Sequence, residues 1–269
     1  MLRDITIGQY YPADSTIHRL DPRTKLAGTL VFIISLFMFR TVGTYMIATL
    51  ALVAIIRISK VPFKFMIKGL KAIILLLMFT VLFSVFMTPG DPLITFFGRF
   101  TITKQGVWQA GFMIVRLTYL IVGSSLMTLT TTPNSLTDGI ESGLGFLRIV
   151  KVPVHEIAMM MSIALRFIPI LLEETDKIMK AQSARGADFE SGGLIKRATN
   201  LVPLLVPLFI SAFRRATDLA MAMEARGYRG GDGRTKMKPL LYKSQDKMAY
   251  LLMVVYFILL FLVKRFVKW

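Results

Sequence analysis

A six-residue pattern, Ala-x-x-Ala-Arg-Gly, occurs twice in this sequence, at residues 181–186 and 222–227. Ala favours helix and keeps the last turn slim, Arg complements the negative end of the helix dipole, and Gly can adopt the left-handed conformation that ends a helix. A single copy would be explained as an ordinary helix C-terminus. Two copies, 41 residues apart and with both alanines repeated, go beyond what capping requires. We therefore predict two slim helix ends that present the guanidinium groups of Arg185 and Arg226 to carboxylates or backbone carbonyls of a partner.

The composition places these two ends in a membrane protein. Of the 269 residues, 54% are hydrophobic, and they gather in long runs that are typical of membrane spans rather than of a soluble core. The formal net charge is +17, but the basic residues stand between the apolar runs, where they set topology and contact membrane lipid; no nucleic acid partner is expected. The absence of cysteine excludes disulfides and thiolate metal sites.

Five apolar runs are expected to cross the membrane: residues 26–39, 41–56, 72–88, 107–132 and 248–263. The shorter runs fall below the ~20 residues that a spanning helix prefers, but snorkelling Lys and Arg side chains at their ends extend them. A polar arm, residues 1–25, precedes the first run and lacks the apolar segment of a signal peptide. Near the end of this arm, Asp21 and Pro22 are suited to cap and begin the first helix.

A basic segment, residues 57–71, separates the second and third runs and contains no acidic residue. Lys60, Lys64 and Lys68 are four residues apart and therefore share one helix face, with apolar residues between them. We predict that this segment is amphipathic and lies on the cytoplasmic face of the membrane.

Two features of the following residues concern the outer side of the membrane. Residues 93–105 are expected to form a short non-cytoplasmic segment, with turns at Gly98 and Gly106. Arg116 lies within the fourth apolar run, and an intramembrane Arg is a functional candidate by default. Its nearness to the outer end of that run favours snorkelling towards the membrane surface instead.

Residues 133–247 differ in character from the rest, with 17 Lys or Arg and 12 Asp or Glu, and they are expected to be cytoplasmic. Ser135 and Asp138 have the spacing of a capping box, which begins a helix. A long amphipathic helix is then expected over residues 154–184, with a bend at Pro169.

The second helix of this region is expected to follow a connector, residues 185–200. Pro203 is predicted to begin the helix, because Pro is well tolerated at the first helical position, and Pro207 follows one turn later. Arg214 and Asp218 are four residues apart on this helix, which predicts a surface ion pair.

Together these patterns predict an all-α integral membrane protein with about five transmembrane helices and a cytoplasmic region of long amphipathic helices. The chain is organised as an N-terminal arm, four transmembrane helices, the amphipathic helix region, and a last transmembrane helix with its tail: 1–25, 26–132, 133–247 and 248–269. The basic arm, the loop at 57–71 and the 133–247 region are expected inside, so the N-terminus lies inside and the tail outside.

Motifs for catalysis and for metal binding are absent from the sequence. It has no P-loop, no H-E-x-x-H and no G-x-S-x-G, and its two histidines, His18 and His155, have no second ligand nearby in sequence. We therefore predict no catalytic residue, no metal site and no cofactor. The 17 methionines are explained either as core filling or as a pliable surface that accepts different partners.

Several motifs, taken together, resemble the transmembrane T component (EcfT) of energy-coupling factor transporters, which are ABC-type importers of vitamins and trace metals. The resemblance covers nearly the whole chain. The two Ala-x-x-Ala-Arg-Gly ends are its specific part. The supporting motifs are Leu-Asp-Pro-Arg-Thr-Lys, Thr-Ile-Thr-Lys-Gln-Gly, Thr-Thr-Thr-Pro, and Ala-Leu-Arg-Phe-Ile-Pro with Glu173, at residues 20–25, 101–106, 130–133 and 164–169.

The resemblance implies a coupling role in the cell membrane of a bacterium. In this family two ATPase subunits (EcfA and EcfA′) bind ATP, a small S component binds the solute, and the T component joins them. Each Arg-Gly end would dock on one ATPase, which assigns that contact to Ala184, Arg185, Gly186, Ala225, Arg226 and Gly227. The apolar faces of the same helices would receive the S component through Met161, Leu165, Pro169, Pro203, Pro207 and Ile210.

Two other classes of protein were weighed. A secondary transporter that binds its own substrate predicts broken helices in matched halves and polar residues at mid-membrane, and neither is visible in the sequence. A membrane enzyme needs a catalytic constellation, and the sequence contains none.

Overall fold

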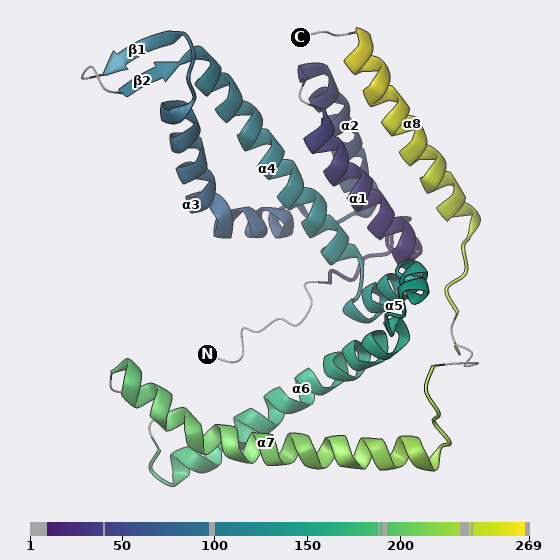
Figure 1. Cartoon of the computed structure of the whole chain (residues 1–269). Coiled ribbons are helices and arrows are strands. Elements are labelled where there is room, and N and C mark those ends of the chain that lie inside the picture. Colours follow the sequence, from purple (N-terminus) through teal and green to yellow (C-terminus); the bar gives the residue numbers. More distant parts are fainter. Residues whose placement is uncertain are drawn as a thin grey trace. The chain divides into compact units, whose positions relative to one another are not determined.

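The computed structural model describes residues 10–39, 41–96, 100–187, 189, 193–231, 237 and 239–266 (Figure 1). The chain divides into two compact units. The first, which we call the bundle unit, contains residues 8–139 and 240–269. The second, which we call the paired-helix unit, contains residues 140–239.

The bundle unit contains five long helices and one β-hairpin among its described residues. Its elements are α1 (Pro22–Met38), α2 (Val42–Ser59), α3 (Phe63–Met87), β1 (Pro92–Phe96), β2 (Phe100–Thr103), α4 (Lys104–Thr130) and α8 (Ser244–Phe266). A shorter helix, α5 (Pro133–Gly143), crosses the boundary between the units. The paired-helix unit continues with a 3₁₀ helix, η2 (Gly145–Val150), and two long helices, α6 (Val154–Ala184) and α7 (Leu194–Ala225). The all-α prediction is confirmed, apart from the hairpin.

The core of the bundle unit lies between α1, α2 and α4. Its buried members are Phe32, Leu36, Tyr45, Ala48, Leu52, Val61, Met66, Val122, Leu126 and Leu129. Most of the remaining large apolar side chains of these helices are exposed, including Leu50 (71% exposed) and Leu75 (76% exposed). An apolar exterior of this kind is stable in lipid, where no hydrophobic penalty applies to it.

The first helix begins as the sequence predicted. The carboxylate of Asp21 accepts a hydrogen bond of 2.9 Å from the backbone N–H of Arg23, and Pro22 is the first helical residue. Helix α2 begins at Val42, with Thr41 at its N-cap.

Most of the predicted short segment 93–105 forms a β-hairpin, and its last two residues begin α4. Strands β1 and β2 pair antiparallel and lead directly into α4, three residues before the predicted start of that span. Thr103 caps α4 by accepting from the N–H of Gly106 at 3.1 Å, so Gly106 belongs to the first helical turn and the predicted turn there is wrong. A Cβ at Gly106 would lie 3.0 Å from the carbonyl oxygen of Val85, so glycine is needed for the close approach of α4 to α3. The other expected turn residue, Gly98, lies outside the described residues.

The basic segment 57–71 does not form one separate amphipathic helix. Its first residues complete α2, which ends with Lys60 in the left-handed conformation (φ 56°), and the rest begins α3 at Phe63. Helix α3 therefore joins the predicted interfacial segment to the predicted third span, and it bends between two straight parts (Figure 1).

Four helices with described residues are long and apolar enough to cross a membrane: α2, α4, α6 and α8. Three of them correspond to predicted spans. The other two predicted spans lie in α1, which has 17 residues, and in α3, in which the shorter segment Ile73–Met87 is apolar. Helix α6 was predicted as amphipathic because its second half carries several charges, but an 18-residue part of it is apolar enough to span a membrane.

The paired-helix unit is dominated by α6 and α7, which pack against each other and cross in Figure 1. Helix α6 is continuous over 31 residues through Pro169. Helix α7 begins at Leu194, inside the predicted connector, so Pro203 and Pro207 are interior residues and the expected start at Pro203 is wrong. Pro has no N–H to donate, yet a helix whose other hydrogen bonds and packing are intact tolerates the loss.

Two smaller predictions in this region are also wrong. Helix α5 is capped by Thr132, whose hydroxyl accepts from the N–H of Ser135 at 3.3 Å, so Ser135 is not the cap of a capping box. The ion pairs among the described residues do not include the expected pair of Arg214 and Asp218; the neighbouring Arg215 bonds instead to Glu174 on α6.

Candidate functional site

The two Ala-Arg-Gly ends adopt the same backbone conformation. Arg185 has φ −87° and ψ 6°, and Arg226 has φ −88° and ψ 9°; each is followed by a left-handed glycine, Gly186 at φ 90° or Gly227 at φ 71°. A Cβ on either glycine would meet no atom within 4 Å, so the positive φ, rather than lack of space, requires glycine there.

The hydrogen bonds at the two ends are also equivalent. At the end of α6, the N–H of Gly186 donates to Ser183 and the N–H of Ala187 donates to Gln182, both at 3.0 Å. At the end of α7, the corresponding bonds run from Gly227 to Glu224 at 2.8 Å and from Tyr228 to Met223 at 3.0 Å. This is the Schellman arrangement, which satisfies the last carbonyls of a helix with the chain's own N–H groups. The capping function of the motif is thus complete without either Arg side chain.

Both arginines are exposed, as are the alanine before and the glycine after each of them: Ala184, Arg185, Gly186, Ala225, Arg226 and Gly227. Within the described part of the chain, neither guanidinium forms a hydrogen bond or an ion pair. Each end therefore offers up to five N–H donors, surrounded by small residues that let another backbone or carboxylate approach closely. Both helix ends expose their guanidinium groups, and what these groups contact stays a prediction.

An ion pair joins the two helices at equivalent positions. Arg215 Nη2 lies 3.1 Å from Glu174 Oε2. Glu174 stands 11 residues before Arg185, and Arg215 stands 11 residues before Arg226, so the ion pair connects the two repeats at the same point. At about 1.5 Å per residue, each Arg-Gly end lies roughly 16 Å beyond the crossing.

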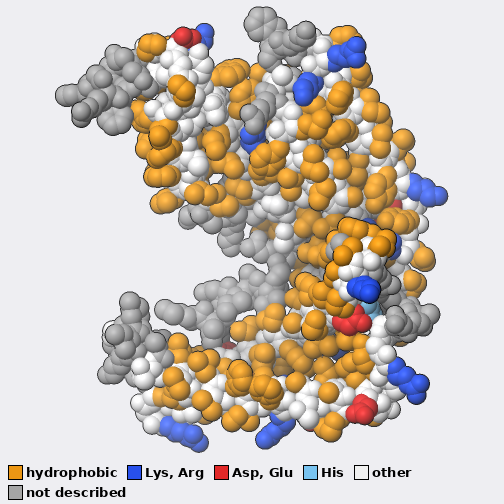
Figure 2. Space-filling view, viewed as in Figure 1, with side chains coloured by type: hydrophobic (Ala, Val, Ile, Leu, Met, Phe, Trp, Pro, Cys, Tyr) orange, Lys and Arg blue, Asp and Glu red, His pale blue; other side chains and the backbone are white. Residues whose placement is uncertain are grey.

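The same two helices carry a broad exposed apolar surface. Figure 2 shows apolar side chains gathered along α6 and α7. The exposed large apolar residues in the first two thirds of α7 are Leu201, Val202, Leu205, Val206, Phe209, Ile210 and Phe213. Of the residues predicted from the family resemblance, Met161, Pro169, Pro203 and Ile210 are exposed, and Leu165 and Pro207 are half-buried. The sequence analysis did not single out Phe209 and Phe213, whose rings pack with centroids 5.1 Å apart. The sequence indicated this surface only through the apolar run 201–213, which is too short to cross a membrane.

The Leu-Asp-Pro-Arg-Thr-Lys motif has a different role, because all its charges have partners in the bundle unit. Arg23 donates to the carbonyl of Leu240 at 2.8 Å, and its guanidinium lies 4.7 Å from the ring centre of Tyr242. Lys25 Nζ donates to the carbonyls of His18 at 3.1 Å and Thr130 at 2.8 Å. The motif thus ties the N-terminal arm, the end of α4 and the start of α8 to α1.

A buried carboxylate completes this cluster. Asp246 is 1% exposed, and it accepts from the backbone N–H of Asp21 and from that of Lys243, each at 2.8 Å. Burial lowers the pKa of Lys25 to about 8, although the charges of Asp246 and Asp21 act in the opposite direction. Lys25 lies just ahead of the first predicted span, and its two carbonyl partners show that its ammonium is held inside the fold.

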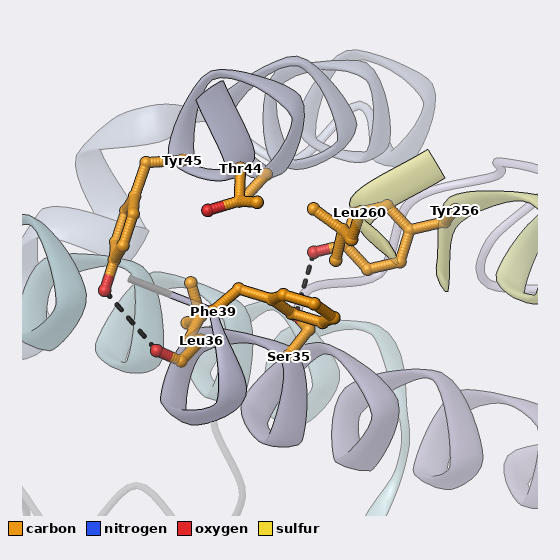
Figure 3. A pocket seen from close by; sticks show the side chains of 8 residues that line it. Ser35, Leu36, Phe39, Thr44, Tyr45, Tyr256 and Leu260 are labelled. Atoms are coloured by element: carbon orange, nitrogen blue, oxygen red, sulfur yellow. Dashed lines mark hydrogen bonds between the residues drawn. The ribbon is translucent and has the colours of Figure 1, made fainter. Parts of the chain in front are cut away.

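Polar groups also occur within the helices of the bundle unit. Arg116 does not extend freely to the membrane surface, because its Nε donates to the Tyr45 hydroxyl at 3.0 Å and its guanidinium lies over Phe37. A small cavity beside these residues is lined by Ser35, Leu36, Phe39, Thr44, Tyr45, Ala48, Tyr256 and Leu260 (Figure 3). Tyr45 donates to the Leu36 carbonyl, and Ser35 and Tyr256 share a 2.8 Å bond. These hydroxyl groups form hydrogen bonds with one another and with backbone carbonyls, which indicates a role in helix packing rather than in ligand binding.

The two histidines have structural partners. His18 bonds to the Ser15 hydroxyl at 2.7 Å and to the Tyr11 carbonyl at 3.1 Å. In the paired-helix unit, Nδ1 of His155 lies 2.9 Å from Glu141, which links the start of α6 to α5. Among the described residues, no group of three or more His, Cys, Asp or Glu could hold a metal ion.

Comparison with known proteins adds independent information. The chain matches the model of the cobalt transport protein family (CbiQ) over residues 13–237. Energy-coupling factor transporter transmembrane protein EcfT of Clostridium kluyveri is 54% identical over 252 residues, 93% of each chain. The protein of the same name from Bacillus subtilis is 48% identical over 264 residues, 98% of this chain and all of the relative's. That of Lactococcus lactis is 42% identical over 261 residues.

These matches include both Arg-Gly ends and extend over almost the full length of the relatives. The helices that can cross a membrane agree with the transmembrane role that the relatives' names state, and they place this chain in the cell membrane as a multi-pass protein. The chain therefore belongs to the EcfT family, the transmembrane proteins of energy-coupling factor transporters.

Proposed function

We propose that this chain is the coupling subunit of an ATP-driven importer. It joins two ABC-type ATPase subunits to a separate S component that binds a vitamin or another micronutrient. ATP hydrolysis belongs to the partner subunits, so this chain is itself non-catalytic. Arg185 and Arg226 make the ATPase contacts, one on each ATPase, together with the alanine and glycine beside them.

One observation carries this proposal: two helix ends of the same conformation each expose a guanidinium without a partner among the described residues. Capping accounts for the glycines but leaves both guanidinium groups unused. Two equivalent ends are suited to two partners of the same fold. Each partner then contacts the same backbone conformation, the same small Ala and Gly residues, and the same set of guanidinium N–H donors. A groove lined with carboxylates or backbone carbonyls would accept either end.

The crossing of α6 and α7 supports the coupling role. Because the Glu174–Arg215 pair lies the same number of residues before each Arg, the two arms beyond it have equal lengths. A change in the separation of two ATPases would therefore move both arms about one crossing point. The movement would reach the apolar side chains on the other parts of α6 and α7, among them Met161, Leu165, Pro169, Pro203, Pro207 and Ile210. These form the surface for the S component in our proposal.

The proposal can be tested by copurification. The tagged chain is coexpressed with its ATPase and S-component candidates, and the Arg185→Ala/Arg226→Ala variant is compared with the wild type. We expect the wild type to retain two ATPases and one S component, and the variant to lose the ATPases at least tenfold while keeping its own fold. The control is Lys180→Ala/Arg214→Ala, which removes two exposed cations from the same helices without touching the ends.

Two outcomes would contradict the proposal. Equal recovery of the ATPases with the double variant and the control would show that the ends are not the docking elements. Transport or solute binding by the purified chain alone would favour a secondary transporter, the alternative in which this chain binds its own substrate.

A further inference from the structure

An open groove of about 410 Å³ lies in the bundle unit beside the C-terminal end of α2. Three segments that are distant in sequence form it: the N-terminal arm, the end of α2 and the first turn of α8. Its lining residues are Asp14, Ser15, Thr16, Arg19, Arg57, Ile58, Lys60 and Gln245. Three of these eight are cations, and neither the ATPase contacts nor the S-component surface proposed above uses them.

The charges in the groove are unbalanced. Asp14 is the one acid in the lining, and Arg19 engages both of its oxygens, at 2.9 and 2.7 Å. Arg19 lowers the pKa of Asp14 through this hydrogen bond and through its charge, so the carboxylate stays ionised and paired. In the described part of the chain, no carboxylate forms an ion pair with Arg57 or Lys60. The described lining residues therefore carry three positive charges against one negative charge, and Arg57 and Lys60 form no ion pair with a described carboxylate.

The position of the groove indicates where its ligand comes from. Helix α2 is long and apolar enough to cross a membrane, and Arg57 stands in its last turn. The end of a spanning helix lies at the level of the lipid headgroups. Lys60 then adopts the left-handed conformation and turns the chain away from the helix axis, so both cations border the groove at this level.

An exposed apolar track continues from the groove along α2. Met46, Leu50 and Val53 are all exposed, and they share one helix face with Arg57 because they are spaced by four, three and four residues. A lipid acyl chain could lie along this track while its headgroup is held at Arg57. Free phosphate would use the cations and leave the track unoccupied.

We propose that this groove binds the phosphate of an anionic phospholipid. Arg57 and Lys60 hold the phosphate, and the lining also contains the Thr16 hydroxyl and the Gln245 amide as neutral donors. The lipid's acyl chains pack on Met46, Leu50 and Val53. The bound lipid would join the N-terminal arm and the start of α8 to α2 at the membrane surface.

Native mass spectrometry of the purified full-length chain can test this site. The delipidated protein is titrated with phosphatidylglycerol, with phosphatidylcholine, and with inorganic phosphate as the soluble source. We expect one phosphatidylglycerol to bind in preference to both others. The Arg57→Gln/Lys60→Gln variant should bind it about tenfold more weakly, since each basic residue near an anionic headgroup contributes on the order of a fewfold to tenfold.

Two further variants make the result specific. Lys64→Gln/Lys151→Gln removes the same charge from exposed positions outside the groove and should bind phosphatidylglycerol like the wild type. Arg57→Lys/Lys60→Arg keeps both charges and should retain the site even if the neutral variant fails to fold. Equal binding by the neutral variant and the wild type, or equal binding of phosphatidylglycerol and phosphatidylcholine, would overturn the proposal. If inorganic phosphate binds as tightly as phosphatidylglycerol does, the site recognises phosphate, and the proposal that it binds a lipid is overturned.

Discussion

Two motifs of this protein, one in each unit, use their cations in opposite ways. In the bundle unit, Arg23 and Lys25 are held by backbone carbonyls and by an aromatic ring. In the paired-helix unit, Arg185 and Arg226 are exposed, and the described residues offer them no partner. Both sets belong to short motifs that the sequence displays equally clearly. The difference lies in whether the motif's hydrogen bonds are complete inside the chain, and this separates residues that stabilise the fold from residues available to a partner.

The comparison implies that substitutions in the two motifs should impair the protein in different ways, one through its stability and the other through partner binding. Removing a held group leaves its partners unpaired in a buried place, so the loss appears as instability. Removing an exposed and unpartnered group costs the isolated chain little, so the loss appears only when a partner is present.

Asp246→Ala should have the largest effect of these substitutions, and it should lower the stability of the folded chain. The substitution leaves two backbone N–H groups, those of Asp21 and Lys243, without their acceptor in a site that is 1% exposed. At about 1–3 kcal/mol for the buried donor of Asp21, and less for the part-buried donor of Lys243, we expect a loss of roughly 2–4 kcal/mol. Unfolding of the detergent-solubilised protein with SDS measures it. Asp218→Ala, at an exposed position on α7, is the control and should change little.

Arg185→Ala and Arg226→Ala should show the opposite behaviour. Each should leave the unfolding midpoint of the isolated chain unchanged, and each should weaken ATPase association by about 1.5–3 kcal/mol, the value of one charge-assisted hydrogen bond. That corresponds to roughly tenfold to a hundredfold, which surface plasmon resonance with each purified ATPase can resolve. A loss of stability in the isolated chain would place these arginines with Arg23 and remove the contrast between the motifs.

The sequence was a good guide where local rules decide the structure. The N-cap of α1 at Asp21 and the ends of α6 and α7 follow from residue types within a few positions, and all of them are present. Helix limits that depend on tertiary packing were harder. Gly106 suggests a turn when considered alone, but its role is to let α4 approach α3, which no local pattern contains.

The partners of charged residues were predicted least well. Sequence spacing suggested that Arg214 pairs with Asp218 on one helix, whereas the structure pairs Arg215 with Glu174 across two helices. The role of Asp246 was missed altogether, because it caps the start of α8 and also binds the N–H of a residue 225 positions away. Contacts between residues so far apart in sequence can be identified only from the folded structure, because no local sequence pattern contains them.

The pH dependence of stability at Lys25 tests the same contrast between charged groups held inside the fold and exposed ones. Burial lowers its pKa from 10.5 to about 8 in the folded chain, so between these values the unfolded chain binds more protons than the folded chain. Stability should therefore rise as pH increases from about 8 to about 10.5, and below about 8 the cost of the buried charge should be constant. Because the ammonium is partly exposed, solvent screening should keep this rise on the order of 1 kcal/mol.

The measurement is the difference in unfolding midpoint between the wild type and Lys25→Met across this pH range. Other Lys and Tyr residues titrate at high pH, but they do so in both proteins and cancel in the difference. Lys64→Met, at an exposed position, should give a difference that does not depend on pH. A Lys25 difference that stays flat from pH 8 to 10.5 would mean that this ammonium is not held inside the fold.

The smallest effect is expected at the crossing of α6 and α7. The Glu174–Arg215 pair is half-buried, with 28% and 36% of the two side chains exposed, and such pairs contribute about 0–1 kcal/mol. Its deletion should therefore hardly change stability. Its position matters more than its energy, because it lies 11 residues before each of Arg185 and Arg226, and we expect it to hold the point from which both arms extend.

A distance measurement can detect this positional role. The chain contains no cysteine, so Ser183→Cys/Glu224→Cys would introduce two specific spin-label sites at equivalent positions near the two ends. Glu174→Arg places a second cation beside Arg215, and like charges in contact repel, so the distribution of distances between the labels should broaden. The exchanged variant Glu174→Arg/Arg215→Glu restores one opposite pair at the same point and should narrow the distribution again. If the exchange leaves the distribution as broad as the single variant does, the crossing is held by apolar packing alone, and the equal arms do not depend on the ion pair.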